Sequence, residues 1–144
     1  MHRLLALPLA AALLAACGGG SEGTRVPFVT IVHTQHSQVP SREELVLRGN
    51  AELNELWGRI SVDGAPLPSI DFSTTQIVGV FLGTRPNGCH HVSISRITRT
   101  TERLVVRYRE TVPGPGDICT QALVTPAHLV ALARTTLPVE FAAE

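Results

Sequence analysis

Helical periodicity occurs in only one stretch of this chain, which restricts the fold more than any other feature. Four apolar side chains recur there at i, i+3, i+4 and i+7, the spacing of one helix face: Leu53, Leu56, Trp57 and Ile60. Asn50 stands where a helix N-cap is expected. Trp57 is expected in the core because it lies on the apolar stripe. Glycine and prolines within 64–68 predict the helix end.

The rest of the chain is typical of short strands, because its apolar residues alternate or form β-branched runs. The predicted strands are 28–33, 44–48, 76–82, 92–97, 104–108, 118–124, 128–132 and 139–141. The nearly continuous apolar run 76–82 predicts a central strand covered on both faces. Segments 92–97 and 104–108 form a predicted hairpin, in which Leu104, Val106 and Tyr108 share one face. The expected fold class is α+β: a single small domain with a mostly antiparallel β-sheet and one main helix.

The first sixteen residues have the features of an export signal. Arg3 supplies a positive charge, and the following 4–16 are apolar and uncharged. This run is too short for a hydrocarbon core of ~30 Å, which needs ~20 helical residues. It ends in Leu14-Ala15-Ala16-Cys17, which resembles the lipobox of bacterial lipoproteins. Residues 1–16 are therefore expected to be a lipoprotein signal peptide and Cys17 the lipidated residue. The alternative is an ordinary cleaved signal with a leftover cysteine.

A glycine-rich stretch follows the cysteine and predicts a flexible tether over residues 17–25, with the globular domain over 26–144. The expected localisation is the cell envelope, with a lipid anchor in the membrane. Residue 18 is Gly rather than Asp, which resembles lipoproteins sorted to the outer membrane if the host is Gram-negative.

Charge argues against nucleic acid as a partner. All twelve basic residues are arginine and twelve residues are acidic, so no long-range attraction to a polyanion is expected. Five arginines nevertheless fall on the predicted hairpin: Arg96, Arg99, Arg103, Arg107 and Arg109. One interpretation is that they dock to an acidic partner or to lipid headgroups. The other, which is favoured, is that they form a solvated sheet face that guards against edge aggregation.

Cys89 and Cys119 are left as an even pair in an exported domain, which predicts a disulfide. Both are expected at the start of strands. If those strands are neighbours, the Cα separation can fall near the ~5.5 Å that a bridge needs. A zinc site with His90 and His91 is disfavoured, because adjacent residues of a strand point to opposite faces and no CxxC or HExxH spacing occurs. Cys89 as a catalytic thiol is disfavoured as well. No metal and no cofactor is expected.

No catalytic constellation stands out, so the chain is predicted not to be an enzyme and to have no catalytic residues. There is no Gly-x-Ser-x-Gly elbow. Asp63, Asp71 and Asp117 lie beside turn-forming residues, where aspartate commonly accepts backbone hydrogen bonds.

Three stretches together resemble a known family. They are Ile70-Asp71-Phe72 leading to 78–83; Arg85-Pro86-Asn87-Gly88; and 113–117 followed by Thr120-Gln121-Ala122 and Thr125-Pro126. Their order is similar to the C-terminal domain of the protease-complex-subunit PrcB family, over roughly residues 70–135. After the Arg-Pro turn the family usually has Gly-Gly-Tyr, whereas this chain has Gly88-Cys89-His90. The resemblance implies a small envelope lipoprotein that serves as an accessory to a protease.

Residues and resemblance together predict a membrane-anchored, non-enzymatic lipoprotein that acts as a protein-binding or protease-accessory module. Its expected partner is an envelope protease or another protein. The expected binding loops are 84–88 and 112–117, which are rich in glycine and proline and so pre-shaped. Their candidate residues are Arg85, Pro86, Asn87, Gly88, Pro113, Gly114 and Asp117. The alternatives are a protease inhibitor-like domain and a structural envelope protein without a dedicated partner.

Overall fold

The computed structural model describes residues 23–60 and 64–144. The predicted signal peptide, Cys17, most of the predicted tether and Asp63 lie outside these ranges. In chain order the elements are β1 (Thr24–Arg25), β2 (Phe28–Thr34), β3 (Glu43–Leu47), α1 (Asn50–Arg59), β4 (Thr75–Phe81), β5 (His91–Arg99), β6 (Leu104–Thr111), β7 (Ala127–Ala133) and β8 (Val139–Ala143).

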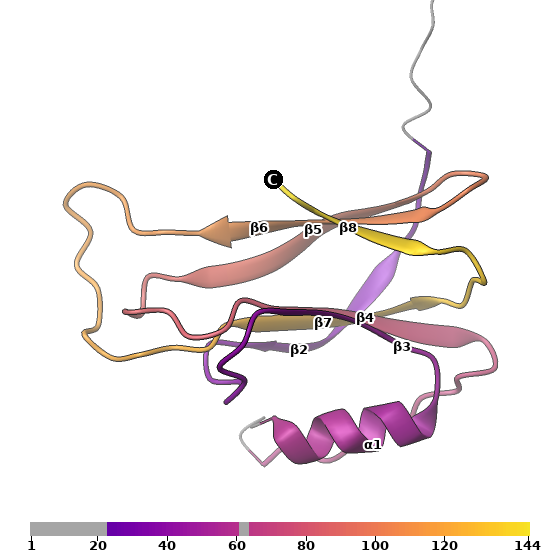
Figure 1. The fold of residues 1–144 in the computed structure, drawn as a ribbon, viewed down its shortest axis with the longest axis horizontal. Coiled ribbons are helices and arrows are strands. Elements are labelled where there is room, and N and C mark those ends of the chain that lie inside the picture. The colour runs from indigo at the N-terminus through magenta and orange to yellow at the C-terminus, as the bar shows by residue number, and fades with distance from the viewer. Residues whose placement is uncertain (1–22, 61–63) are drawn as a thin grey trace, which may run out of the picture.

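The strands form two stacked sheets rather than one, and α1 makes a third layer (Figure 1). One sheet has the order β1-β5-β6-β8 and the other the order β2-β7-β4-β3. All pairs are antiparallel except β6 with β8. The helix covers the outer face of the second sheet (Figure 1). This arrangement confirms the predicted small α+β domain with mostly antiparallel strands.

Strand β4 lies in the middle layer and is buried on both faces, as its apolar sequence predicts. Ile77 and Phe81 belong to the core between this sheet and α1. Val78 and Val80 belong to the second core, between the two sheets. The hairpin follows its predicted period as well, because Val106 and Tyr108 on β6 face that second core.

The start of α1 differs from the expectation. Gly49 occupies the N-cap and Asn50 is the first helical residue, so the predicted side-chain cap at Asn50 is wrong. No side chain caps the helix at Gly49. The carboxylate of Glu52 lies in the first turn and accepts a bond of 3.4 Å from the N–H of Arg48. A negative charge at that end is favourable to the helix dipole.

Trp57 lies at the edge of the core rather than inside it. Its side chain is half-buried against the α1 core cluster. The indole N–H donates to the carbonyl of Ala65 at 3.4 Å. An indole needs a partner for this N–H, which favours an edge position over full burial.

Two further differences concern the strands. The predicted strand 118–124 is wrong, because only Val124 forms an isolated bridge there, with Arg85. Ile118 and Leu123 are exposed in this segment, and only Val124 is buried. At the other end, Thr24 and Arg25 pair with β5, so ordered pairing begins two residues before the predicted domain start at residue 26.

Candidate partner-binding loops

Two connections meet at one end of the stacked sheets, on the left of Figure 1. The Arg85 loop (residues 84–90) joins β4 to β5, and the Ile118 loop (residues 112–123) joins β6 to β7. The N–H of Gly88 donates to the carbonyl of Thr120 at 2.9 Å. Arg85 and Val124 exchange two backbone bonds of 2.8 and 3.0 Å. The backbones of the two connections therefore lie side by side.

A disulfide between Cys89 and Cys119 joins the two loops, as predicted, with a Cα–Cα distance of 5.3 Å and 30 residues of sequence between them. Because the two sulfurs are bonded to each other, neither serves as a metal ligand or a thiol nucleophile in this state. Within residues 23–60 and 64–144, no group of three or more His, Cys, Asp or Glu side chains is arranged to hold a metal ion.

Gly88 permits the close approach of the two loops. A Cβ at this position would lie 3.1 Å from the Cβ of Thr120 and 3.2 Å from its hydroxyl oxygen, closer than ordinary contact allows. Asn87 closes the turn by accepting a bond of 3.0 Å from the N–H of Cys89. From the bend directly after β2, the side-chain amide of Gln35 donates to the carbonyls of Gly88 and His90, both at 2.9 Å.

Arg85 is a structural anchor of its loop. Its guanidinium makes a two-pronged ion pair with Glu110, with Nε–Oε1 and Nη2–Oε2 distances of 2.6 and 3.2 Å. It also donates to the carbonyl of Leu82 at 2.8 Å. The bonds from Arg85 lower the pKa of Glu110. His90 lies 3.4 Å from the same carboxylate, without hydrogen-bond geometry. The sequence did not point to Glu110, because it follows Arg85 by 25 residues.

Asp117 shapes the turn within the Ile118 loop. Its carboxylate accepts a bond of 2.7 Å from the N–H of Gly114, and its own N–H donates to the Gly114 carbonyl at 3.2 Å. Asp71 does the same elsewhere, accepting from the N–H and hydroxyl of Ser73. The turn-forming role predicted for these two aspartates is confirmed.

The Ile118 loop exposes large apolar side chains that the sequence did not single out. The exposed fractions are 99% for Ile118, 70% for Leu123 and 58% for Val112. Every residue of this loop except Cys119 is exposed. Single exposed apolar residues are common, but three on one braced loop mark a surface suited to protein contact. The expected candidates Arg85 and Asp117 shape these loops, whereas Ile118 is the side chain most open to a partner.

Residues 76–133 match the family model described as PrcB C-terminal. Over this segment the chain is similar to the PrcB C-terminal family. The matched segment runs from β4 through β7 and so contains both loops, the disulfide and Glu110. The stretch Ile70-Asp71-Phe72, which contributed to the resemblance, precedes the matched segment. No curated protein and no solved structure was found to match the chain. Among the described residues, none of the helices is both long and apolar enough to cross a membrane.

Proposed function

We propose that this chain is a lipid-anchored, non-enzymatic lipoprotein of the cell envelope that binds an envelope protease as an accessory module. The match of residues 76–133 to PrcB C-terminal, a family whose name points to a protease complex, supports the protease as partner. The observation that carries the binding surface is Ile118, a fully exposed apolar side chain on a disulfide-braced loop.

The bracing of both loops supports a binding role energetically. The disulfide, the Gly88–Thr120 bond and the Arg85–Glu110 pair fix the loop backbones before any partner arrives. Pre-organised loops lose less conformational entropy on association, so more of the contact energy appears as affinity. Apolar side chains that fill a pocket on the partner commonly dominate such interfaces.

Substituting Ile118 with Asp is expected to abolish stoichiometric capture of the protease. The tagged lipoprotein would be purified from detergent-solubilised native envelope, and the co-purifying proteins identified by mass spectrometry. Loss of a central apolar anchor costs about 2 kcal/mol or more, which lowers affinity roughly 30-fold. Circular dichroism should show an unchanged fold, because Ile118 buries almost no surface in the free chain.

Val29→Asp is the matched control, since Val29 is 71% exposed on β2, in neither loop. It should retain the protease at the wild-type ratio. Capture of no protease by the wild type, or equal capture by both variants, would argue against this loop as the binding surface.

The anchor is tested separately. Cys17→Ser is expected to prevent incorporation of labelled palmitate and to move the chain from the membrane to the soluble fraction, because the thiol at residue 17 is the proposed acylation site. Wild type and variant would be compared by metabolic labelling and fractionation. Unchanged palmitate labelling of the variant would exclude Cys17 as the lipidated residue.

A second candidate function is inhibition of the protease. It is favoured by one feature, the position of the 99%-exposed Ile118 directly beside a disulfide, which suits a rigid loop inserted into an active-site cleft. The captured protease separates the two functions: its activity on a peptide substrate falls on addition of the chain if the chain inhibits, and is kept or raised if the chain is an accessory.

A further inference from the structure

Three arginines that form no ion pair with any described residue share the outer face of the sheet β1-β5-β6-β8. Arg96 on β5 and Arg107 on β6 are direct cross-strand partners. Arg25 on β1 lies opposite Thr98, two residues further along β5. Together with Gly23 and Thr98, the three arginines line one shallow cleft of about 240 Å³. We call this set, Arg25, Arg96 and Arg107, the arginine face.

Electrostatics sets the arginine face apart from its neighbours. Like charges placed directly opposite each other on a sheet repel, so the Arg96–Arg107 pair is unfavourable in the free chain. Within the part of the chain that the structure describes, no carboxylate lies within 4.0 Å of these three guanidinium groups. Arg107 donates only to the neutral hydroxyl of Thr98, at 3.0 Å. None of these three arginines therefore forms an ion pair with a described residue.

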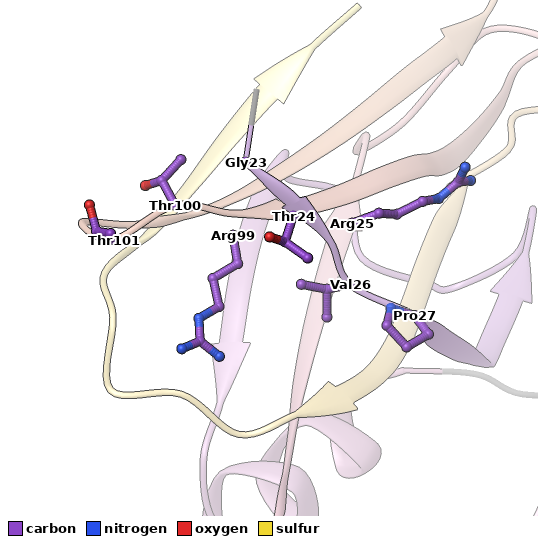
Figure 2. A pocket seen from close by; sticks show the side chains of 8 residues that line it. All are labelled: Gly23, Thr24, Arg25, Val26, Pro27, Arg99, Thr100 and Thr101. Carbon is purple, nitrogen blue, oxygen red and sulfur yellow. The ribbon is translucent and has the colours of Figure 1, made fainter. Parts of the chain in front are cut away.

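The neighbouring arginines of the predicted basic strip behave differently. Arg103 pairs with Glu140 at 2.8 Å and Arg109 with Glu144 at 3.3 Å. Arg99 does not line the cleft of the arginine face. It lines a neighbouring pocket together with Gly23 and Arg25, and Figure 2 shows its side chain extending in a different direction from that of Arg25. A solvated surface with ion pairs accounts for Arg103 and Arg109. It does not explain why Arg96 lies opposite Arg107. Glu140, which lines a pocket together with Arg107, forms its ion pair with Arg103 instead.

The cleft lies where the chain enters the domain. Gly23 lines the cleft itself, and Cys17 precedes Gly23 by six residues. Six residues span at most about 20 Å even when fully extended. The sheet that contains β1 lies on the opposite side of the domain from α1 (Figure 1). A lipid anchor at Cys17 would thus keep the arginine face within reach of the membrane surface.

We propose that the arginine face binds the phosphate groups of anionic phospholipids, so that this sheet face lies on the membrane that holds the anchor. The guanidinium fork is suited to phosphate, to which it donates two parallel hydrogen bonds. A bound headgroup between Arg96 and Arg107 would relieve their repulsion. Helix α1 would then point away from the membrane, and the Arg85 and Ile118 loops at the end of the sheets would stay open to a partner. The inference goes beyond the protease-binding function and draws on the proposed anchor only for proximity.

The test measures how well the membrane shields each side of the domain from solvent. The full chain, purified from the envelope, carries a dye on Ala142→Cys, the β8 neighbour of Arg107, or on Ala51→Cys, an exposed position of α1. Each labelled variant is bound to vesicles of phosphatidylcholine alone or of phosphatidylcholine mixed with phosphatidylglycerol. Quenching of the dye fluorescence by neutral acrylamide is then recorded. Phosphatidylglycerol is expected to shield position 142 and to leave position 51 unchanged.

Charge variants then test the three arginines. Each arginine near an anionic surface contributes about 1 kcal/mol, so each Arg→Gln substitution in the arginine face should lower the docked-to-undocked ratio about fivefold, and all three together roughly 100-fold. High salt should also lower the docked-to-undocked ratio, because it screens the attraction between the arginines and the phosphates. Arg59→Gln removes the same charge from α1 and should leave shielding unchanged. Arg96→Gln should not lower the melting temperature, because it relieves the repulsion from Arg107.

Equal quenching at position 142 in both vesicle types would overturn the proposal. Shielding seen only in native envelope, and not in phosphatidylglycerol vesicles, would assign the face to a protein partner and overturn it as well. Flotation with phosphatidylcholine vesicles reports the anchor independently. If the chain does not float there, arginine-dependent flotation with phosphatidylglycerol vesicles still decides the proposal.

Discussion

Replacing Cys89 and Cys119 together with serine is expected to lower the free energy of unfolding by about 3–4 kcal/mol. The bridge closes a chain segment of 30 residues, and its removal restores the corresponding loop entropy to the unfolded chain. For a domain of this size, such a loss lowers the melting temperature by roughly 10 °C. Denaturant unfolding of wild type and double variant, under non-reducing conditions, measures the difference directly.

Reductant supplies the control for this prediction. Adding it to the wild type should reproduce the stability of the double variant, which itself should not respond. Alkylation followed by mass spectrometry should label Cys89 and Cys119 only after reduction. Equal labelling with and without reductant would mean that the protein in solution lacks the bridge.

Replacing both cysteines with serine is also expected to weaken protease binding, because the disulfide joins the two proposed partner-binding loops. The Gly88–Thr120 and Arg85–Val124 backbone bonds remain without it, so the loops should stay adjacent but open more often. Protease capture by the double variant should therefore be weakened less than by Ile118→Asp, which removes the contacting side chain itself.

Local patterns predicted most of the elements and the faces that they bury. The continuous apolar run of β4 indicated burial on both sides, and alternation placed Val106 and Tyr108 in the core. Both signals are local, because strand side chains alternate whatever the partner strand is. The pairing itself is not local, so the division into two sheets and the parallel β6–β8 pair could not be read from the sequence.

The candidate site was predictable in part for the same reason. The predicted export signal and an even cysteine count indicated the bridge, and neither requires knowledge of the fold. The ion pair of Arg85 with Glu110 depends on where β6 ends relative to β4, and the sequence carries no signal for that. Ile118 and Leu123 resembled strand residues because they are apolar, and only the absence of a covering layer over this loop shows that they are exposed.

Acidification between pH 6.5 and 4 is expected to destabilise the domain by about 3 kcal/mol through one buried histidine. His128 on β7 is 4% exposed, and burial, with a smaller contribution from the charge of His33, lowers its pKa to about 4 from the ordinary 6.5. Between pH 6.5 and 4, His128 therefore binds a proton in the unfolded chain but not in the folded chain. The stability is complete above pH 6.5 and is lost as the pH falls toward 4, at about 1.4 kcal/mol per unit.

The hydrogen bonds of His128 explain why the neutral form is required. Its Nδ1 accepts a bond of 2.9 Å from the N–H of Ile94, which lies at the bulge in β5 across the core. The ring therefore keeps its proton on Nε2, which lies 2.9 Å from the hydroxyl of Thr30. The His33 ring stacks on it with 4.3 Å between ring centroids, so a charge on both rings would be doubly unfavourable. Protonation of His128 at Nδ1 breaks this hydrogen bond between the two sheets and leaves the Ile94 N–H without an acceptor.

Denaturant unfolding at several pH values, compared with two variants, tests this assignment. His128→Gln keeps an acceptor for Ile94, lowers stability at pH 7 and should flatten the slope between pH 6.5 and 5. His36→Gln alters an exposed histidine and should keep the wild-type slope. Glu43 and Glu110 also have lowered pKa values, but carboxyl groups whose ordinary pKa is 4.5 take up protons in the unfolded chain only near and below that value. A slope above pH 5 that survives His128→Gln would therefore have to come from another histidine, whereas a slope that vanishes identifies the buried ring between the sheets as the acid-sensitive group.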